Sequence, residues 1–148
     1  MNHIDGPLLK IDVSNKEVKE ENIEDILNEF IGGRGVATKL AYERIPFDIN
    51  PLDEDNSLFF SIGPFQLSTM SFTGRMNCTS LSPLTNGIFS SNVGGFLSRY
   101  FAQSGYSVIQ VTGKSDELTA VHVTPNGVEF EDVSNLEMAK VDETGEYM

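Results

Sequence analysis

Cysteine, tryptophan and basic residues are scarce in this sequence. Its 148 residues include one cysteine, Cys78, and no tryptophan, and ten lysines and arginines stand against 22 aspartates and glutamates. A single cysteine excludes an internal disulfide, and it excludes a zinc site or an iron–sulfur cluster held by thiolates of this chain alone. One free cysteine is also typical of a reducing compartment.

Long apolar runs are missing as well. No stretch approaches the roughly 18 apolar residues of a membrane-spanning helix, and the first residues have neither the basic nor the apolar region of a signal peptide. The formal net charge of −12 opposes the phosphates of nucleic acid, and the few basic residues are scattered along the chain. We therefore expect a cytoplasmic protein that binds neither a membrane nor a nucleic acid.

The apolar pattern predicts one strand-rich α+β domain, because a chain of this length can bury a core of its own. Alternation, or a short apolar run between turn residues, predicts strands at 8–14, 17–20, 57–64, 75–82, 88–91, 106–113, 118–124 and 127–133. Helical spacing predicts helices at 21–31, 34–45 and 96–105. The expected fold is two packed β-sheets with two or three helices.

Two further expectations concern the last predicted helix and the C-terminal segment. In the helix at 96–105 the apolar residues Phe96, Leu97, Tyr100 and Phe101 fall on one side. The segment 137–148 is polar and acidic and has only weak helical periodicity. We therefore assign residues 1–136 to the folded domain and 137–148 to an acidic tail in which order fades.

One segment combines glycines with few charges. Asn92, Gly94 and Gly95 stand where a strand-like run turns into a helix, and backbone N–H groups at such a place favour a phosphate. A glycine pair before a helix is more often a plain turn. Arg75, at the start of a strand, is suited to contact an anion or the edge of a heteroaromatic ring, although a surface ion pair is the commoner role. Arg34, at the elbow between two expected helices, is also suited to bind an anion, although capping of backbone carbonyls or pairing with an aspartate or glutamate is commoner.

Other reactive side chains offer no recognisable catalytic pattern. His3 and His122 lie far apart in the sequence and belong to no Ser-His-Asp arrangement, so neither is assigned a role. Cys78 falls within an expected strand and is interpreted as a small core residue rather than a nucleophile. The residues alone thus indicate an α+β domain with a possible anion site and no nameable catalytic acid or base.

Four blocks of the sequence resemble a known family. In chain order they are IGGRGVATKL, INPLDEDNSLFFSIGP, GRMNCTSLSPLTNGIFSSNVGGFLSRYFAQSGYSVIQVTGK and VHVTPNGVEFEDV. Together they are similar to the N-terminal domain of the tungsten-containing aldehyde ferredoxin oxidoreductases, in the family's order and spacing, from about Gly6 to Leu136. The resemblance implies a β-rich base for a tungsten, or in some relatives molybdenum, bis-pterin cofactor.

The resemblance also implies roles for particular residues. The arginine matching Arg75 reaches the pterin near the iron–sulfur cluster, and the asparagine matching Asn92 gives its backbone carbonyl to a magnesium ion that bridges the two pterin phosphates. The glycines matching Gly94 and Gly95 lie beside those phosphates. The complete enzymes oxidise aldehydes to carboxylic acids and pass electrons through a [4Fe–4S] cluster to ferredoxin.

Departures from the family pattern leave alternatives open. The family domain continues beyond the last residue of this sequence, and its cluster cysteines lie in later domains. The first reading is therefore part of an oxidoreductase, completed by its remaining domains or by a cysteine-rich partner subunit. The second is a non-catalytic, stand-alone relative that binds a phosphorylated ligand or a partner enzyme. The third is a truncated product, whose uncovered apolar surface would lead to self-association.

Overall fold

The chain begins with a β-hairpin. The structure is a computed structural model that describes residues 6–147. Its first two strands, β1 (Leu8–Asp12) and β2 (Glu17–Glu21), pair antiparallel, as the alternating pattern predicts. The Asp12 carboxylate accepts hydrogen bonds from the backbone N–H groups of Ser14 and Asn15, which stabilises the turn between the strands.

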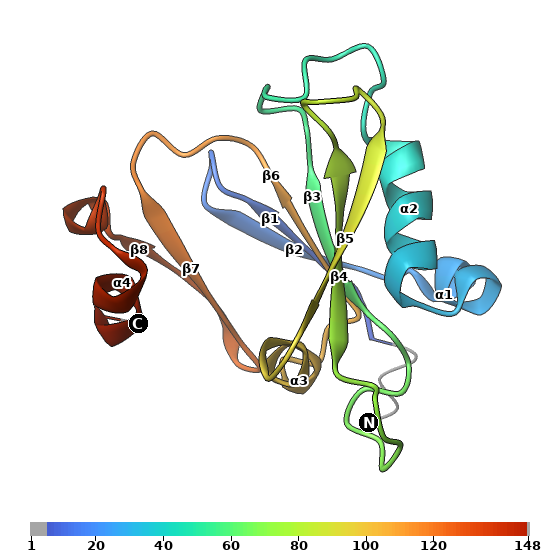
Figure 1. Cartoon of the computed structure of the whole chain (residues 1–148). Coiled ribbons are helices and arrows are strands. Elements are labelled where there is room, and N and C mark those ends of the chain that lie inside the picture. The colour runs from blue at the N-terminus through green and yellow to red at the C-terminus, as the bar shows by residue number, and fades with distance from the viewer. Residues whose placement is uncertain (1–5, 148) are drawn as a thin grey trace.

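Six strands form the main sheet, in the order β2-β1-β6-β3-β4-β5 (Figure 1). β1 and β6 are parallel, and every other neighbouring pair is antiparallel. Because β5 ends this order, it is an edge strand within the described part of the chain. The remaining strands of this sheet are β3 (Leu58–Ile62), β4 (Arg75–Leu81), β5 (Ile88–Gly94) and β6 (Val108–Thr112).

Two helices cover one face of this sheet (Figure 1). α1 (Glu24–Phe30) starts later than the sequence pattern predicts, because β2 extends to Glu21, while α2 (Gly33–Arg44) matches its expected range closely. α2 packs closely on β3 and β4 through the small residues Ala37 and Ala41, which are fully buried. The largest side chain in this core is Phe59, and burying such a side chain contributes about 1.5–3 kcal/mol.

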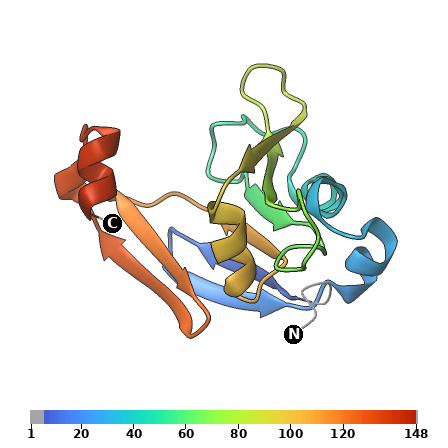
Figure 2. The ribbon, with the colours of Figure 1, turned by 60° about the horizontal axis from the view of Figure 1, so that its bottom comes forward.

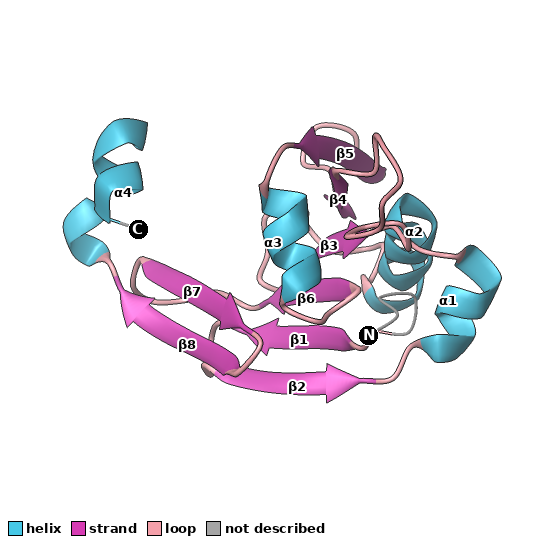
Figure 3. Ribbon diagram, turned by 90° about the horizontal axis from the view of Figure 1, so that it is seen from below, coloured by secondary structure: helices cyan, strands magenta, loops and turns pink. Residues whose placement is uncertain are grey.

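A second core lies on the opposite face (Figure 2). It is covered by α3 (Leu97–Gln103) and by a separate hairpin of β7 (Thr119–Thr124) and β8 (Gly127–Asp132). Figure 3 shows this hairpin beside β1 and β2. Pro125 and Asn126 form its tight turn, as predicted, and two sheets with flanking helices confirm the expected α+β class.

The last segment contains two short helices. After a short 3-10 helix (Ser134–Leu136), residues 141–147 form α4 (Val141–Tyr147), which brings the α-helices to four among the described residues, where two or three were predicted. No α4 residue is buried, but the Tyr147 hydroxyl donates to the Glu131 carboxylate on β8 at 2.8 Å. This hydrogen bond connects the end of α4 to β8. The division at residue 136 stays a prediction.

Candidate functional site

Strands β4 and β5 bring three of the four proposed site residues to one end of the sheet. β5 runs from Ile88 to Gly94, whereas the sequence pattern ended this strand at residue 91. In the antiparallel register Arg75 lies opposite Gly94, and Asn77 lies opposite Asn92. Arg75 and Asn92 are both exposed. Asn92 therefore belongs to an edge strand, and only Gly95 falls in the turn before α3.

The backbone carbonyl of Asn92 points away from β4. Next to the turn that joins β4 to β5, the Ser82 N–H donates to the Gly87 carbonyl, which makes these two residues a hydrogen-bonded pair. Hydrogen-bonded and non-hydrogen-bonded pairs alternate along an antiparallel ladder, so the pair of Asn77 and Asn92 is non-hydrogen-bonded. Because β5 is an edge strand, the N–H and C=O groups of Asn92 face outward from the sheet.

A buried amide holds the Asn92 side chain. Asn77 is 3% exposed, and its Nδ2 atom donates to the Ser90 hydroxyl at 2.6 Å, to the Ser91 carbonyl at 3.0 Å and to the Asn92 Oδ1 atom at 3.4 Å. The Asn77 Oδ1 atom accepts from the Thr79 hydroxyl at 2.7 Å. This cluster is a polar support for the edge strand. The sequence pattern does not reveal this cluster, because nothing in an alternating run distinguishes a supporting asparagine from a solvent-facing one.

The two glycines leave open space beside the edge strand. Gly95 has φ +104°, a backbone conformation that only glycine adopts readily, and no atom lies within 4 Å of the position that a Cβ would occupy. A Cβ on Gly94 would lie 3.7 Å from the carbonyl oxygen of Gly74, which is an ordinary contact. A ligand can therefore approach this backbone closely.

The charge around the site is unusual for so acidic a chain. No aspartate or glutamate occurs from residue 56 to residue 115, although the chain has 22 of them. This stretch includes Arg75 and Arg99, and the ion pairs of residues 6–147 involve neither. The surface ion pair considered for Arg75 is therefore wrong for the described part of the chain. Two guanidinium groups remain available for an anion.

Helix α3 exposes most of its apolar side. Only Phe101 of the four residues expected on one face is buried, at 7% exposure, whereas Phe96 and Tyr100 are 74% and 66% exposed. The helix packs instead through Ser98, Phe101 and Ala102. These residues are three and four positions apart, so they form a buried stripe on one side of the helix. It has seven residues, so its dipole is small. The expected contribution of a helix start to anion binding is correspondingly weak.

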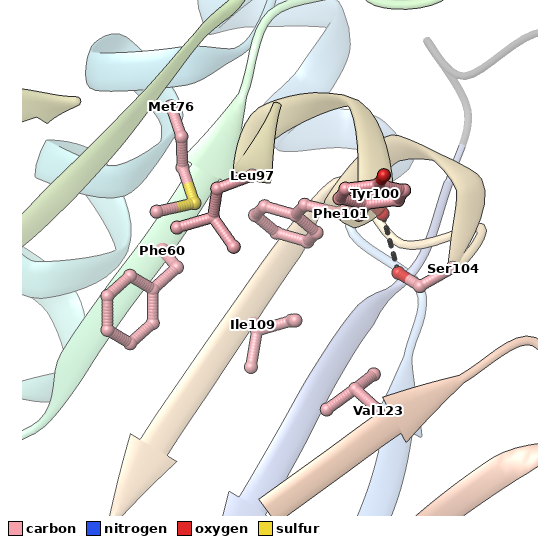
Figure 4. Close-up of a pocket in the computed structure, with 8 residues that line it drawn as sticks. All are labelled: Phe60, Met76, Leu97, Tyr100, Phe101, Ser104, Ile109 and Val123. Carbon is pink, nitrogen blue, oxygen red and sulfur yellow. Dashed lines mark hydrogen bonds between the residues drawn. The ribbon is translucent and has the colours of Figure 1, made fainter. Parts of the chain in front are cut away.

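An apolar cavity of about 370 Å³ lies beside this helix. Its walls come from α3, from the second face of the main sheet and from β7, and Figure 4 shows Leu97, Phe101 and Ile109 converging on it. The only polar lining groups are Tyr100 and Ser104, and the Ser104 hydroxyl already donates to the Phe101 carbonyl at 2.6 Å. The cavity is suited to apolar contact, and Tyr100 is the one lining residue with a titratable side chain.

The remaining reactive side chains do not join the site. Cys78 is half-buried on β4, and burial raises the pKa of its thiol, which keeps it neutral and unreactive near pH 7. His122 is partly buried, and its Nε2 atom lies 2.9 Å from a Glu131 carboxylate oxygen. Among residues 6–147 no group of three or more His, Cys, Asp or Glu side chains could hold a metal ion. His3 lies outside the described residues.

Comparison with known proteins identifies the family of this chain. A family model described as "Aldehyde ferredoxin oxidoreductase, N-terminal domain" matches residues 8–148. The chain belongs to this family. It thereby belongs to a family of oxidoreductases, as the resemblance in the sequence implied, and the match includes the segment assigned above to an acidic tail.

Curated relatives of this aldehyde ferredoxin oxidoreductase domain are much longer than the chain. The tungsten-containing aldehyde ferredoxin oxidoreductases of Pyrococcus furiosus and Thermococcus kodakarensis are 29% and 31% identical to it over 140 residues, which cover 94% of the chain and 23% of each relative. An aliphatic sulfonate oxidoreductase, WOR-like subunit, of Pyrococcus furiosus is 30% identical over 134 residues, covering 87% of the chain and 21% of the relative. The chain thus spans about a quarter of the length of these relatives.

A solved structure shares the fold of this aldehyde ferredoxin oxidoreductase domain. The active-site complex BamBC of benzoyl coenzyme A reductase, determined with 1,5-dienoyl-CoA, superposes with a TM-score of 0.93 and 26% identity. The alignment covers 99% of the chain and 23% of that structure. Further domains are therefore part of the family's architecture. No helix within residues 6–147 is both long and apolar enough to cross a membrane.

Proposed function

We propose that this chain is the cofactor-binding part of an aldehyde ferredoxin oxidoreductase-type enzyme and that it binds the phosphates of a tungsten or molybdenum bis-pterin cofactor. The residues we assign are Arg75, Asn92, Gly94 and Gly95. The observation that carries the proposal is the register of β4 and β5, which sets Arg75 opposite Gly94 on the edge strand. Arg75 has no ion-pair partner within residues 6–147, and no carboxylate is near it in the sequence. Tungsten-containing relatives support the choice of metal.

The residues present fit the anionic part of such a cofactor. Arg75 supplies an exposed guanidinium, and such groups form strong charge-assisted hydrogen bonds with anions. The open space at Gly95 admits a phosphate close to the backbone. The outward carbonyl of Asn92 is an oxygen ligand of the kind that magnesium prefers, so it would hold a magnesium ion when the cofactor is bound.

The chemistry belongs to the bound cofactor, and the chain's residues bind and orient it. When bound, the cofactor would supply the oxidation of an aldehyde to a carboxylic acid, with electrons leaving through an iron–sulfur cluster to ferredoxin. With Cys78 as its one cysteine, the chain does not hold that cluster by itself. We infer that the remaining domains or a cysteine-rich partner subunit hold it, and that the enzyme works in the cytoplasm of an anaerobic cell.

The exposed side of α3 supports the need for such a partner. Leu97 and Tyr100 of this short helix, and Phe96 directly before it, are each more than half exposed beside the proposed site. Apolar groups gathered in this way commonly mark an interface, and they would favour self-association if left uncovered. The alternative is a non-catalytic relative. Such a protein would bind a phosphorylated ligand or a partner enzyme through the same surface and would not carry out the redox step.

Anaerobic affinity purification of the tagged chain from its native host tests the proposal. Tungsten, molybdenum and iron are quantified per chain, and co-purifying proteins are identified. We expect tungsten or molybdenum, together with iron held by further domains or by a cysteine-rich partner. A folded chain that carries neither metal would contradict the proposal and favour the non-catalytic relative.

A further inference from the structure

A polar cavity lies between α3 and the loop that joins β3 to β4. Its volume is about 260 Å³, and its lining includes Gln66 and Thr73 from the loop and Arg99 from α3. The cavity borders the proposed cofactor site, because Gly74 lines it and a Cβ on Gly74 would lie 3.8 Å from the Gly95 carbonyl oxygen. None of the four residues assigned to the cofactor lines it.

Gln66 lines this cavity, and its side chain has a buried oxygen without a hydrogen-bond partner within residues 6–147. The residue is 3% exposed, and its Nε2 atom donates to the backbone carbonyls of Arg75, at 2.9 Å, and of Thr73. Two carbonyl partners fix which end of the amide is nitrogen, since only the NH2 group can donate. The Oε1 atom is buried and has no hydrogen-bond partner within residues 6–147. Leaving such an acceptor unsatisfied costs about 1–3 kcal/mol.

Arg99 brings a positive charge to the same cavity. Its side chain is exposed and forms no ion pair within the described residues, and the stretch from residue 56 to residue 115 contains no carboxylate to neutralise it. The nearby hydroxyls are already used inside the loop, because Ser68 donates to the Phe65 carbonyl and Thr73 donates to the Met70 carbonyl. Recognition in the cavity therefore rests on one guanidinium and one carbonyl oxygen.

The loop is held in a conformation that its residues do not favour. Leu67 and Phe72 have φ values of 61° and 66°, and neither is a glycine. Such residues cost of order 1–3 kcal/mol each and persist only where the surrounding structure holds them. The two bonds from Gln66 to the end of the loop do this. The cavity is thus shaped before any ligand arrives.

We propose that this cavity binds a small anion that carries its own hydrogen-bond donor. The negative charge pairs with Arg99, and an O–H group of the ligand donates to the Gln66 Oε1 atom. Hydrogenphosphate and the hydroxy acid glycolate have both features. Sulfate and acetate have the charge without the donor. The inference goes beyond cofactor binding, and its test requires no metal or pterin.

Isothermal titration of the full chain at pH 7 and constant ionic strength compares the two pairs of anions. We expect at least one pair to discriminate by roughly tenfold or more, hydrogenphosphate over sulfate or glycolate over acetate, because an acceptor left unpaired by the ligand weakens binding. Sulfate carries at least as much charge as phosphate, so this preference would not arise from charge alone. The pair that discriminates identifies the ligand as an inorganic oxyanion or as a hydroxy acid.

Substitutions separate this cavity from general attraction to a positive charge. Arg99→Gln should abolish saturable binding of the preferred anion, whereas Lys140→Gln, the same charge change on an exposed residue near α4, should leave it unchanged. Gln66→Met would remove the two bonds that hold the loop together with the Oε1 atom, so the preference within each pair is tested on the unsubstituted chain. Equal affinities within both pairs of the unsubstituted chain would overturn the proposal and indicate that water satisfies Gln66. Absence of saturable binding, or equal effects of the arginine and lysine variants, would also overturn it.

Discussion

Asn77 and Asn92 face each other across the β4–β5 pair, with the Nδ2 atom of the first 3.4 Å from the Oδ1 atom of the second. The buried amide thus supports the side chain of a residue whose backbone carbonyl faces outward. Support of this kind restricts the edge strand, because a side chain fixed on one face limits rotation of the backbone it belongs to. The residue proposed to bind magnesium is therefore supported by a buried side chain that is not among the four residues assigned to the cofactor.

We expect Asn77→Ala to destabilise the fold and loosen β5. The variant leaves the Thr79 hydroxyl without its acceptor and removes the donor that serves Ser90 and Ser91, a loss of about 1–3 kcal/mol. Chemical denaturation measures the loss, and hydrogen exchange of β5 amides reports the local loosening. Ser91→Ala is the control on the same strand, since Ser91 is exposed and contributes only its backbone carbonyl to the cluster. Equal stability of Asn77→Ala and the unsubstituted chain would contradict this role.

Arg75→Ala should reduce tungsten or molybdenum retention and leave the fold intact. The guanidinium is exposed and has no ion-pair partner within residues 6–147, so its removal costs no core contact. Loss of a charge-assisted hydrogen bond of about 1.5–3 kcal/mol corresponds to roughly a 10- to 100-fold loss of affinity. Metal content per chain after anaerobic purification and the thermal midpoint are measured together. Lys140→Ala controls for net charge, and unchanged metal content in Arg75→Ala would refute the assignment.

Gly95→Ala should destabilise the chain more than Gly94→Ala. A Cβ at Gly95 meets no neighbouring atom, but φ +104° is strained for any residue other than glycine, at a cost of about 1–3 kcal/mol. Gly94 does not have a positive φ, and its Cβ would make an ordinary contact. Thermal unfolding should show a midpoint several degrees lower for the Gly95 variant alone. Equal midpoints would mean that the turn adapts to a side chain.

The contact between α4 and β8 should depend on pH. The hydrogen bond from Tyr147, followed by the one from His122, lowers the pKa of Glu131 below its ordinary 4.5. A carboxyl with a depressed pKa in the folded state stabilises the fold above its unfolded value, and this contribution disappears as the pH falls through the folded value. α4 should therefore loosen below about pH 4.5.

NMR titration of the Glu131 carboxyl measures this effect. In Tyr147→Phe the hydroxyl donor is lost, so the pKa of Glu131 should rise toward its ordinary value. Tyr42→Phe is the control, since no hydrogen bond of its hydroxyl to Glu131 exists within the described residues. A Glu131 pKa that does not move in Tyr147→Phe would show that His122 alone governs it.

Local sequence signals determined most elements of this protein. Alternation located the β1–β2 hairpin, the Pro125–Asn126 turn located the β7–β8 hairpin, and helical spacing located α2. These signals act over a few neighbouring residues, through side-chain direction and turn conformation, so they can be read without knowing the partner strands. The family resemblance was likewise carried by sequence blocks, and the family match confirms it.

Tertiary structure decided the surroundings of the candidate site. The register of β4 and β5 sets Arg75 opposite Gly94 and turns the Asn92 carbonyl outward, and neither fact follows from a residue's near neighbours. The same holds for α4, whose Tyr147 binds a carboxylate on another element, and for Gln66, whose amide spans its loop. Strand order and loop closure depend on contacts between segments distant in sequence. Only the folded chain decides which of its polar groups are paired and which remain free to bind a ligand.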